Sequence, residues 1–458
     1  MRLVLSVISL FFVCNLFANK IEESYFVYSN SASLKNNLIR NSQLVLDHAS
    51  RKGFELYGPK GLGEYLNRLN VKFVNLESLE SINKKSHQFS YPSYEQVVKR
   101  LQNAVAKYSK FMKMISVGKS VEGRDLWVVK ISDNVLVDEV EPEFKYISSM
   151  HGDEIVGREL LQSFIEDLGA AYVSGDKEIT KLINDTEIFI MPSMNPDGSE
   201  VPQRGNGNNV DLNRNFPNPF VGNLNFRNAS QRRVFQGGRT PTSFIDQMQE
   251  KLEPETIAIM KFQEERNFSL SANFHGGAVV FNYPWDSIYE RHPLNDFLID
   301  ISLDYSKLNA TMWNSREFDR GITNGADWYI VLGGMQDWSY VVHNDLQFTV
   351  ELSDIKYPNF SDIPKFYKEN RESLISFIQY IYSGAGFEWQ NKRNESGFVE
   401  IQTAAGASLG KFPWKNGEFY KVLPTGNYLY VIYNKQGNML KKLPVVVEDT
   451  GKISILKL

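Results

Sequence analysis

The stretch "SSMHGDEIVGRELL", residues 148–161, places a histidine and a carboxylate, His151 and Glu154, where an apolar run ends and a helix-like pattern begins. Two such side chains three positions apart can face one point at a strand end, so they could form half of a metal site. Short patterns of common residue types also arise by chance, and a buried histidine bonded to an acid explains the same stretch. A metal site therefore requires a further ligand.

A third ligand is available in "LSANFHGGAVVFNYPWD", where His275 ends an apolar strand. Gly276 and Gly277 follow it and allow a sharp turn and the close approach of a substrate. Catalytic zinc sites commonly use three His or acidic ligands and leave one position for water. The sequence has no HExxH pair, which disfavours a thermolysin-like site. We interpret the other histidines as surface or packing residues: His48, His87, His292 and His343.

A Gly- and Asn-rich segment carries three polar side chains that can converge on one pocket, Arg204, Asn213 and Arg214. Guanidinium groups suit carboxylates because their planar fork donates two parallel hydrogen bonds. A solvated Asn-rich loop explains the same composition, so this segment alone leaves both interpretations open.

Two further candidates follow. Tyr329 lies in a predicted loop, and Glu351 ends the apolar strand "QFTVELS". A lone carboxylate is costly to bury unless it is paired or takes part in chemistry. Glu351 is therefore a candidate general base beside a metal-activated water.

The elements that must position these residues indicate an α/β domain over residues 91–385, with a mixed central sheet flanked by helices. Residues 19–90 form a small α+β unit, and residues 386–458 show short alternating strands typical of a small β-sandwich. The segments that carry the candidate metal-binding and catalytic residues lie at predicted strand ends, where open α/β sheets form their clefts.

Residues 1–18 have a basic start, an apolar stretch and a small final residue, which is the pattern of a secretory signal peptide. We expect an exported protein, periplasmic or secreted, without a membrane span after signal removal. Cys14 is the one cysteine and would leave with the signal, so a disulfide framework and a thiol nucleophile are excluded. The net charge of −4, without a basic stripe, argues against nucleic acid as a partner. No feature of the sequence predicts an oligomeric state.

Taken in order, "HGDE", "NPDG", "DLNRNFP", "LSANFHGG", "NYPWD", "GGMQDW" and "FTVELS" closely resemble the zinc metallocarboxypeptidases of the carboxypeptidase A/B type. The resemblance is strongest to the branch that includes carboxypeptidases E, N and D, and it covers about residues 92 to 385. It extends to "GEFYKVLPTGNY", which resembles the transthyretin-like domain that follows the catalytic domain in that branch.

The resemblance implies one Zn²⁺ per chain, held by His151, Glu154 and His275, with Glu351 as the general base. It implies that Arg204 polarises the scissile carbonyl.

The same resemblance implies that Asn213, Arg214 and Tyr329 hold the terminal carboxylate of the substrate. Such a clamp makes an exopeptidase, because an internal peptide bond has no carboxylate to place there. The implied partners are the C-termini of peptides or proteins.

Asp286 and Gln336 match positions that contact a basic C-terminal side chain in the E/N/D branch, so the resemblance implies a preference for Lys or Arg. A simple turn-capping role explains Asp286 equally. Asp153 stands where pancreatic-type relatives have arginine and E-like enzymes have asparagine; it either tunes substrate preference or is exposed.

Two other functions are compatible with the sequence. One is a cell-wall (murein) peptide carboxypeptidase, and the other is a non-catalytic peptide-binding module, which the complete ligand set and Glu351 disfavour. The unit at 19–90 is interpreted as a propeptide that covers the cleft or assists folding, with Lys84 and Lys85 as a processing site. The sandwich is interpreted as a folding and packing module.

Overall fold

A computed structural model describes residues 21–41, 43–76, 78, 91–220 and 252–458 of the chain. The predicted signal peptide, Cys14, His87 and the predicted processing site lie outside these residues. Among the described residues, every helix is too short or too polar to cross a lipid bilayer.

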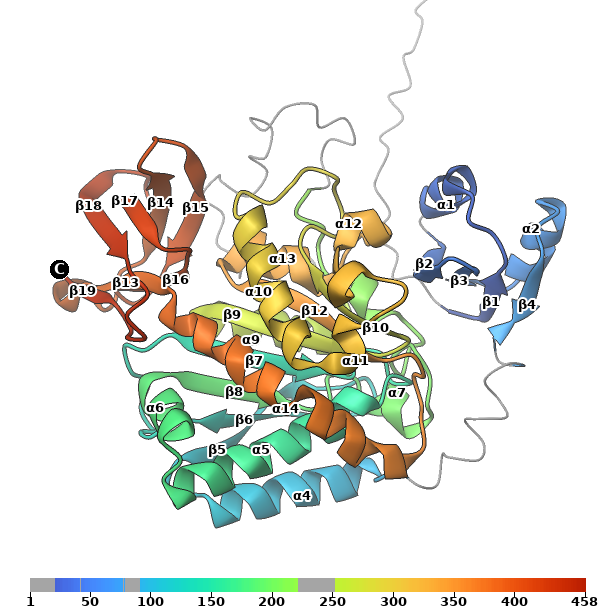
Figure 1. The fold of residues 1–458 in the computed structure, drawn as a ribbon, viewed down its shortest axis with the longest axis horizontal. Helices are drawn as coiled ribbons and strands as arrows, with labels where there is room; N and C mark the ends of the chain where they lie inside the picture. Colours follow the sequence, from blue (N-terminus) through green and yellow to red (C-terminus); the bar gives the residue numbers. More distant parts are fainter. Residues whose placement is uncertain (1–20, 42, 77, 79–90, 221–251) are drawn as a thin grey trace, which may run out of the picture.

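The central unit is built on a mixed sheet of eight strands in the order β11-β10-β12-β9-β7-β8-β6-β5 (Figure 1). The four strands β12, β9, β7 and β8 run parallel to one another, and antiparallel strands flank them on both sides. The strand bounds are β5 Met112–Lys119, β6 Asp125–Ile131, β7 Glu143–Ser148, β8 Glu187–Met191, β9 Phe268–His275, β10 Ala278–Tyr283, β11 Ile322–Asn324 and β12 Leu346–Ser353.

Both faces of this sheet are covered by helices. Successive side chains of a strand point to opposite faces, so Phe144 and Tyr146 of β7 join the apolar core under α5 and α14, whereas Ile147 joins the core under α9 and α13. The helix bounds are α4 Tyr94–Lys107, α5 Val156–Ser174, α6 Lys177–Asp185, α7 Pro196–Glu200, α9 Pro254–Glu265, α10 Asn295–Leu308, α11 Ala310–Trp313, α12 Gly325–Trp328, α13 Met335–His343 and α14 Ile363–Gln379.

Residues after α14 form two small sheets that pack face to face, β16-β13-β19 and β15-β14-β17-β18. Buried aromatic residues fill the space between the sheets, among them Trp414, Phe387 and Tyr430. Their strands are β13 Gly384–Glu388, β14 Gly397–Thr403, β15 Ser408–Trp414, β16 Glu418–Val422, β17 Gly426–Asn434, β18 Met439–Val447 and β19 Ile455–Lys457.

The N-terminal unit has the element order β1 α1 β2 β3 α2 β4 and one antiparallel sheet in the order β2-β3-β1-β4. It has an apolar core of its own, built around Val27, Phe54 and Leu66. The bounds are β1 Glu23–Val27, α1 Ala32–Ile39, β2 Val45–Ser50, β3 Gly53–Gly58, α2 Leu62–Arg68 and β4 Phe73–Asn75.

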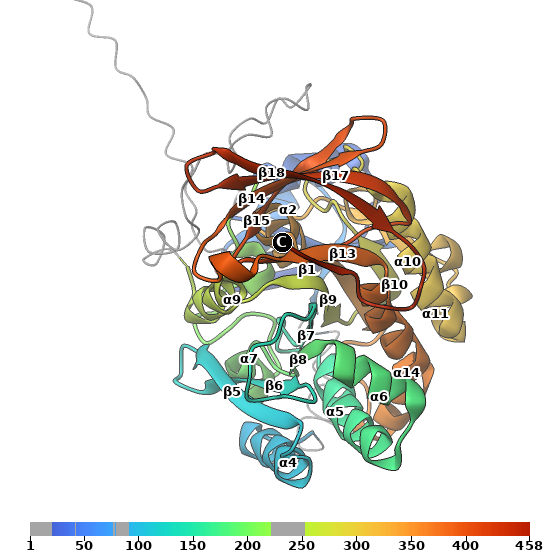
Figure 2. The ribbon, with the colours of Figure 1, turned by 90° about the vertical axis from the view of Figure 1, so that its left-hand side faces the viewer.

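The N-terminal unit and the C-terminal sandwich lie at opposite ends of the central unit, as Figures 1 and 2 show together. The predicted fold class is confirmed: a mixed sheet flanked by helices, a small all-β sandwich after it and a small α+β unit before it. The N-terminal unit reaches the strand ends where the predicted site residues lie, through contacts of Asp47 and His48 with Arg204, Tyr329 and Glu351.

Candidate metal centre and cleft

The three predicted metal ligands meet at the carboxyl ends of β7 and β9. His151 and Glu154 lie in the loop between β7 and α5, and His275 is the last residue of β9. Their ligand atoms all lie within 4.8 Å of one another. The Nδ1 atoms of the two imidazoles are 3.1 Å apart, and each faces one oxygen of Glu154, at 2.9 Å and 2.8 Å.

This donor set fits a zinc ion. Two ring nitrogens and a carboxylate converge on one buried point, and Zn–N bonds of about 2.0–2.1 Å in a tetrahedron put two nitrogens about 3.4 Å apart. All three side chains are 1 to 3% exposed, so bulk water has little access to the point between their ligand atoms. Burial and the Arg204 charge oppose protonation of His151, but Glu154 and Asp211 outweigh them and raise the pKa of His151 to about 9. Binding a metal there therefore displaces protons.

A buried aspartate, Asp211, orients this centre and was not among the residues predicted from the sequence. Asp211 Oδ1 lies 3.0 Å from His151 Nε2, on the far side of the ring from the metal-facing Nδ1. Its other oxygen accepts from Arg204 Nε at 2.9 Å. Outer carboxylates of this kind set the tautomer and ring orientation of a metal-bound histidine. The local signal was available, because Asp211 opens the "DLNRN" motif, but its partner lies far away in the chain.

Glu351 stands beside the metal ligands because of the strand register. β12 pairs in parallel with β9 so that Glu351 is opposite His275, and both side chains lie at the same end of the sheet. Glu351 is 3% exposed, and its Oε2 has no hydrogen-bond partner among the described residues. A buried carboxylate with an unoccupied oxygen next to a metal centre is arranged to accept a proton.

The predicted clamp residues also gather at this end of the sheet. Arg204 is buried, and its Nη1 lies 3.3 Å from Glu154 Oε1, which places the guanidinium at the edge of the metal centre. Asn213 and Arg214 follow in a short 3-10 turn, Leu212–Arg214, where the Asn213 Oδ1 accepts from the first amide of α13.

Tyr329 directly follows α12 and turns its hydroxyl toward the same cleft. The structure thus brings all the predicted metal, base and clamp residues to one place.

Asp286 and Gln336 are buried and in direct contact with each other. Gln336 Nε2 donates to Asp286 Oδ1 at 2.7 Å, and Asn282 Nδ2 donates to the same oxygen at 3.1 Å. Burial and the neighbouring Asp337 raise the pKa of Asp286 well above its usual range. Asp337, in the first turn of α13, accepts from the Asp286 amide at 3.0 Å and so holds this loop in place.

Two interpretations from the sequence are wrong in part. His48, interpreted as an ordinary surface or packing residue, lies in the cleft, with its Nε2 3.7 Å from Glu351 Oε1. Asp153 is 3% exposed, so the simple exposed role is excluded. His292 and His343 are buried packing residues, as interpreted.

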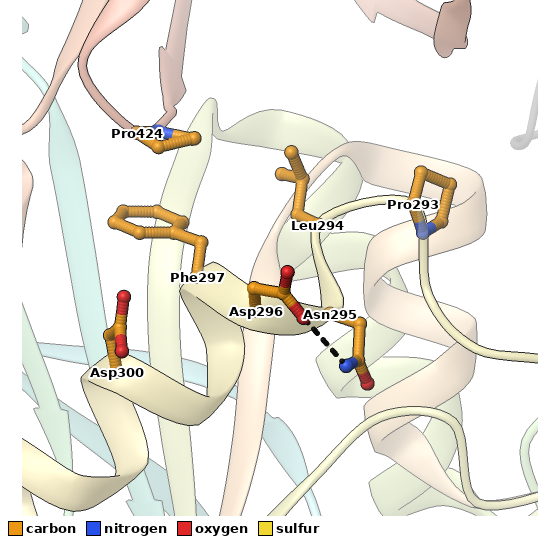
Figure 3. A pocket seen from close by; sticks show the side chains of 7 residues that line it. All are labelled: Pro293, Leu294, Asn295, Asp296, Phe297, Asp300 and Pro424. Atoms are coloured by element: carbon orange, nitrogen blue, oxygen red, sulfur yellow. Dashed lines mark hydrogen bonds between the residues drawn. The ribbon is translucent and has the colours of Figure 1, made fainter.

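A cavity of about 380 Å³ opens elsewhere, at the start of α10 (Figure 3). Its charged side chains, Asp296 and Asp300, are exposed, and Asn295 donates to Asp296 at 3.2 Å across its rim. None of the metal, base or clamp residues lines it. Its lining also includes Pro424 of the sandwich, so it marks the junction of two domains.

Comparison with known proteins identifies this arrangement. The family model for zinc carboxypeptidase matches residues 97–373. Human carboxypeptidase D is 37% identical over 398 residues, covering 81% of this chain and 27% of that protein. Mouse carboxypeptidase M is 37% identical over 369 residues, covering 74% of this chain and 77% of that protein. The chain spans about a quarter of the length of carboxypeptidase D.

The crystal structure of carboxypeptidase A from Helicoverpa armigera superposes with a TM-score of 0.57 at 18% identity, covering 79% of this chain and 97% of that chain, and it shows the shared fold. The predicted resemblance and the predicted zinc cofactor are confirmed by the family match and by the buried His151, Glu154 and His275 group. The chain belongs to the zinc carboxypeptidase family, in the branch of carboxypeptidases D, M and N.

Proposed function

We propose that the protein is an exported zinc-dependent exopeptidase that removes the last residue of peptides or proteins and prefers Lys or Arg at that position. The observation that carries the proposal is the placement of Glu351 beside a buried His₂Glu cluster, with Arg204 at its edge. Family membership supports the hydrolytic activity.

Each side chain has a separate task in this proposal. Zinc, when bound, supplies a Lewis acid that polarises the scissile carbonyl and acidifies a water. Glu351 takes the proton from the attacking water and later delivers it to the leaving amine. Arg204 donates to the oxygen that becomes negative in the transition state.

Arg214, Asn213 and Tyr329 hold the free carboxylate of the substrate, which positions the last peptide bond for attack.

The preference for a basic residue rests on Asp286 and Gln336. Asp286 is 4% exposed and Gln336 is 1% exposed, so a ligand that reaches them is desolvated and meets two oxygen acceptors. A cationic side chain gains most from a carboxylate in such a place. The Gln336 Oε1 has no hydrogen-bond partner among the described residues, which leaves it available to a donor on the substrate.

Export is proposed from the signal-like pattern of residues 1–18. Recovery of the protein outside the cytoplasm, with a mature N-terminus near Lys20 or further along the chain, is the expected result. Recovery only from the cytoplasm with Met1 intact contradicts it.

The proposal is tested with peptides that differ only in the last residue, Arg, Lys, Phe or Ala, together with a muropeptide ending in a diamino acid, each with and without a chelator. We expect release of the last residue with kcat/KM at least tenfold higher for Arg and Lys than for Phe, and no release with the chelator. If the muropeptide is hydrolysed faster than every other peptide, the substrate is a cell-wall peptide and the proposed substrate class is wrong. If peptides bind but none is hydrolysed, the protein is a non-catalytic binding module.

Asp286→Asn tests the specificity separately. Loss of the carboxylate should lower kcat/KM for Arg and Lys peptides by about 10- to 100-fold, the effect of about 1.4–2.7 kcal/mol at a charge-assisted hydrogen bond. The Phe peptide should change less than threefold. Equal losses for all peptides contradict a specificity role.

The pH dependence has a defined sign. Burial and the neighbouring Asp337 raise the pKa of Asp286, so this carboxyl ionises at a higher pH than an ordinary aspartate, and KM for Arg and Lys peptides should fall as pH rises through that range. In the Asp286→Asn variant this difference between basic and Phe peptides should disappear.

A further inference from the structure

Two lysines of the C-terminal sandwich reach the central unit, and each lies at the C-terminal end of a helix. Lys415, between β15 and β16, donates to three main-chain carbonyls at the end of α9, of which the Glu264 carbonyl is the nearest at 2.5 Å. Lys421 of β16 donates to the side-chain oxygen of Asn344, the C-cap residue of α13. The last carbonyls of a helix lack intrahelical partners and carry partial negative charge, so both positions suit a cation.

The turn at Asn344 is held from two sides. Asn344 has a left-handed backbone with φ of 72°, and its Nδ2 donates to the Tyr420 carbonyl at 3.1 Å while its Oδ1 accepts from Lys421. The following residue, Asp345, forms an ion pair with Lys145 of β7. The sandwich therefore fixes one side of this turn, and the central sheet fixes the other.

The turn joins two elements that carry predicted site residues. α13 ends at the turn and begins at the cleft, where its first amide donates to Asn213 and Gln336 donates to Asp286. β12 starts at Leu346, directly after the turn, and carries Glu351. A nine-residue helix is about 13 Å long and stiff along its axis, so a shift at its C-cap reaches the residues in its first turn.

A pair of buried rings gives Lys421 a second route to the same pocket. Its Nζ lies 4.4 Å from the centre of the Tyr340 ring, which belongs to α13. The Tyr340 ring packs edge to face against Trp285, with centroids 5.4 Å apart. Because Trp285 directly precedes Asp286 in the chain, Lys421 contacts the helix and, through Tyr340, the loop that carries this carboxyl group.

We propose that Lys421 is a positioning residue of the specificity pocket: by fixing Asn344 it sets the place of α13, and so of Gln336. The inference rests on the proposed function for the role of that pocket. A hydrogen bond weakens steeply with distance and angle, so a small shift of α13 weakens the contact between Gln336 and Asp286. The sandwich then takes part in substrate selection, although the residues proposed to bind substrate belong to the central unit.

A packing role alone favours a different residue at position 421. Lys421 is 0% exposed, and besides Asn344 its ammonium contacts the Phe412 ring, whose centre is 4.0 Å away. Burial lowers the pKa of Lys421 well below its usual range, because the charged form loses its water. An apolar side chain of similar length would fill the same space without that cost. The two accounts therefore differ in what Lys421→Met does to the protein.

The test uses the full chain with Lys421→Met and with Asn344→Gly, each of which removes one side of the link. Methionine keeps most of the length of the lysine stem, and glycine adopts the left-handed backbone of position 344 without strain. Both variants should therefore melt at the same temperature as the unchanged chain or at a higher one. Lys441→Met is the matched control, because Lys441 is an exposed lysine of β18.

In both variants KM for an Arg-ending peptide should rise about fivefold or more, whereas kcat/KM for a Phe-ending peptide should change less than about twofold. A loss of stability alone would lower both activities together. The double variant should behave like either single variant, because both changes remove the same link. Lys441→Met should match the unchanged chain with both peptides.

Hydrogen exchange of the amides in α13 reads the same contact without turnover, and we expect it to be about threefold faster or more in both variants. The inference is overturned if exchange is unchanged in both variants, or if peptides are hydrolysed with an unchanged ratio of kcat/KM between the Arg and Phe peptides. If exchange rises but no chain hydrolyses any peptide, the positioning role stands and the proposed function fails. Either variant decides alone if the other does not fold.

Discussion

Glu351→Gln should leave zinc bound and the fold intact while lowering kcat by about 10²- to 10⁴-fold, which is the usual contribution of a positioned general base. Glutamine has nearly the same shape as glutamate, but its amide does not accept the proton of the attacking water. The side chain is outside the His151, Glu154 and His275 group, so zinc content should stay near one per chain. The loss corresponds to about 3–5 kcal/mol in the activation free energy.

The measurement is kcat on an Arg-ending peptide together with zinc content by elemental analysis. Glu448→Gln is a matched control, because Glu448 is an exposed glutamate on the sandwich, and its kcat should be unchanged. Near-normal turnover of Glu351→Gln would show that the base is a different group. Loss of zinc along with turnover would show that Glu351 supports the metal centre itself.

His275→Ala should abolish turnover by removing zinc. His275 faces both Glu154 at 2.8 Å and His151 at 3.1 Å, so its loss leaves two ligands where a catalytic site needs three. Outer-shell changes alone cost about 10- to 100-fold in metal affinity, and loss of a direct ligand should cost more.

Zinc content after dialysis checks this expectation, with Glu351→Gln as the partner variant because it alters the neighbouring strand without touching a ligand. We expect zinc to be retained in Glu351→Gln and lost in His275→Ala. Full zinc occupancy in His275→Ala contradicts the assignment of the third ligand.

The sequence predicted the parts of this site that local patterns encode. His151 and His275 follow runs of buried apolar residues, and such runs end where parallel sheets form their clefts. Helix and strand periodicity also located the central sheet and the sandwich. The short alternating strands predicted over residues 386–458 are present, and β14 at Gly397–Thr403 is one of them.

Features that depend on distant pairing were missed. Asp211 is a short polar residue in a Gly- and Asn-rich segment, and only the folded chain shows that it holds His151. The role of Asp337 was also missed, because its carboxylate accepts from the Asp286 amide, which is far away in the sequence.

The contact between the N-terminal unit and the cleft residues could not be predicted from local sequence patterns. His48 and Asp47 lie in a strand whose bulge depends on pairing with β3. Their partners, Glu351 and Arg204, both come from the central unit. A signal for Asp47 existed only as a charged residue within the apolar segment "LVLDHA". Buried charges of this kind are costly unless paired, so such a residue is worth testing as a contact between units.

With zinc bound, the cleft should cut a single residue from a peptide that has a free C-terminus. Mass spectrometry tests this directly with two peptides ending in Arg, one with a free carboxylate and one with a C-terminal amide, each incubated with the chain. We expect loss of a single Arg from the free peptide, no product from the amide, and no product from either when zinc is chelated. Cleavage of the amide at an equal rate, cleavage at an internal bond, or no cleavage of the free peptide contradicts this function.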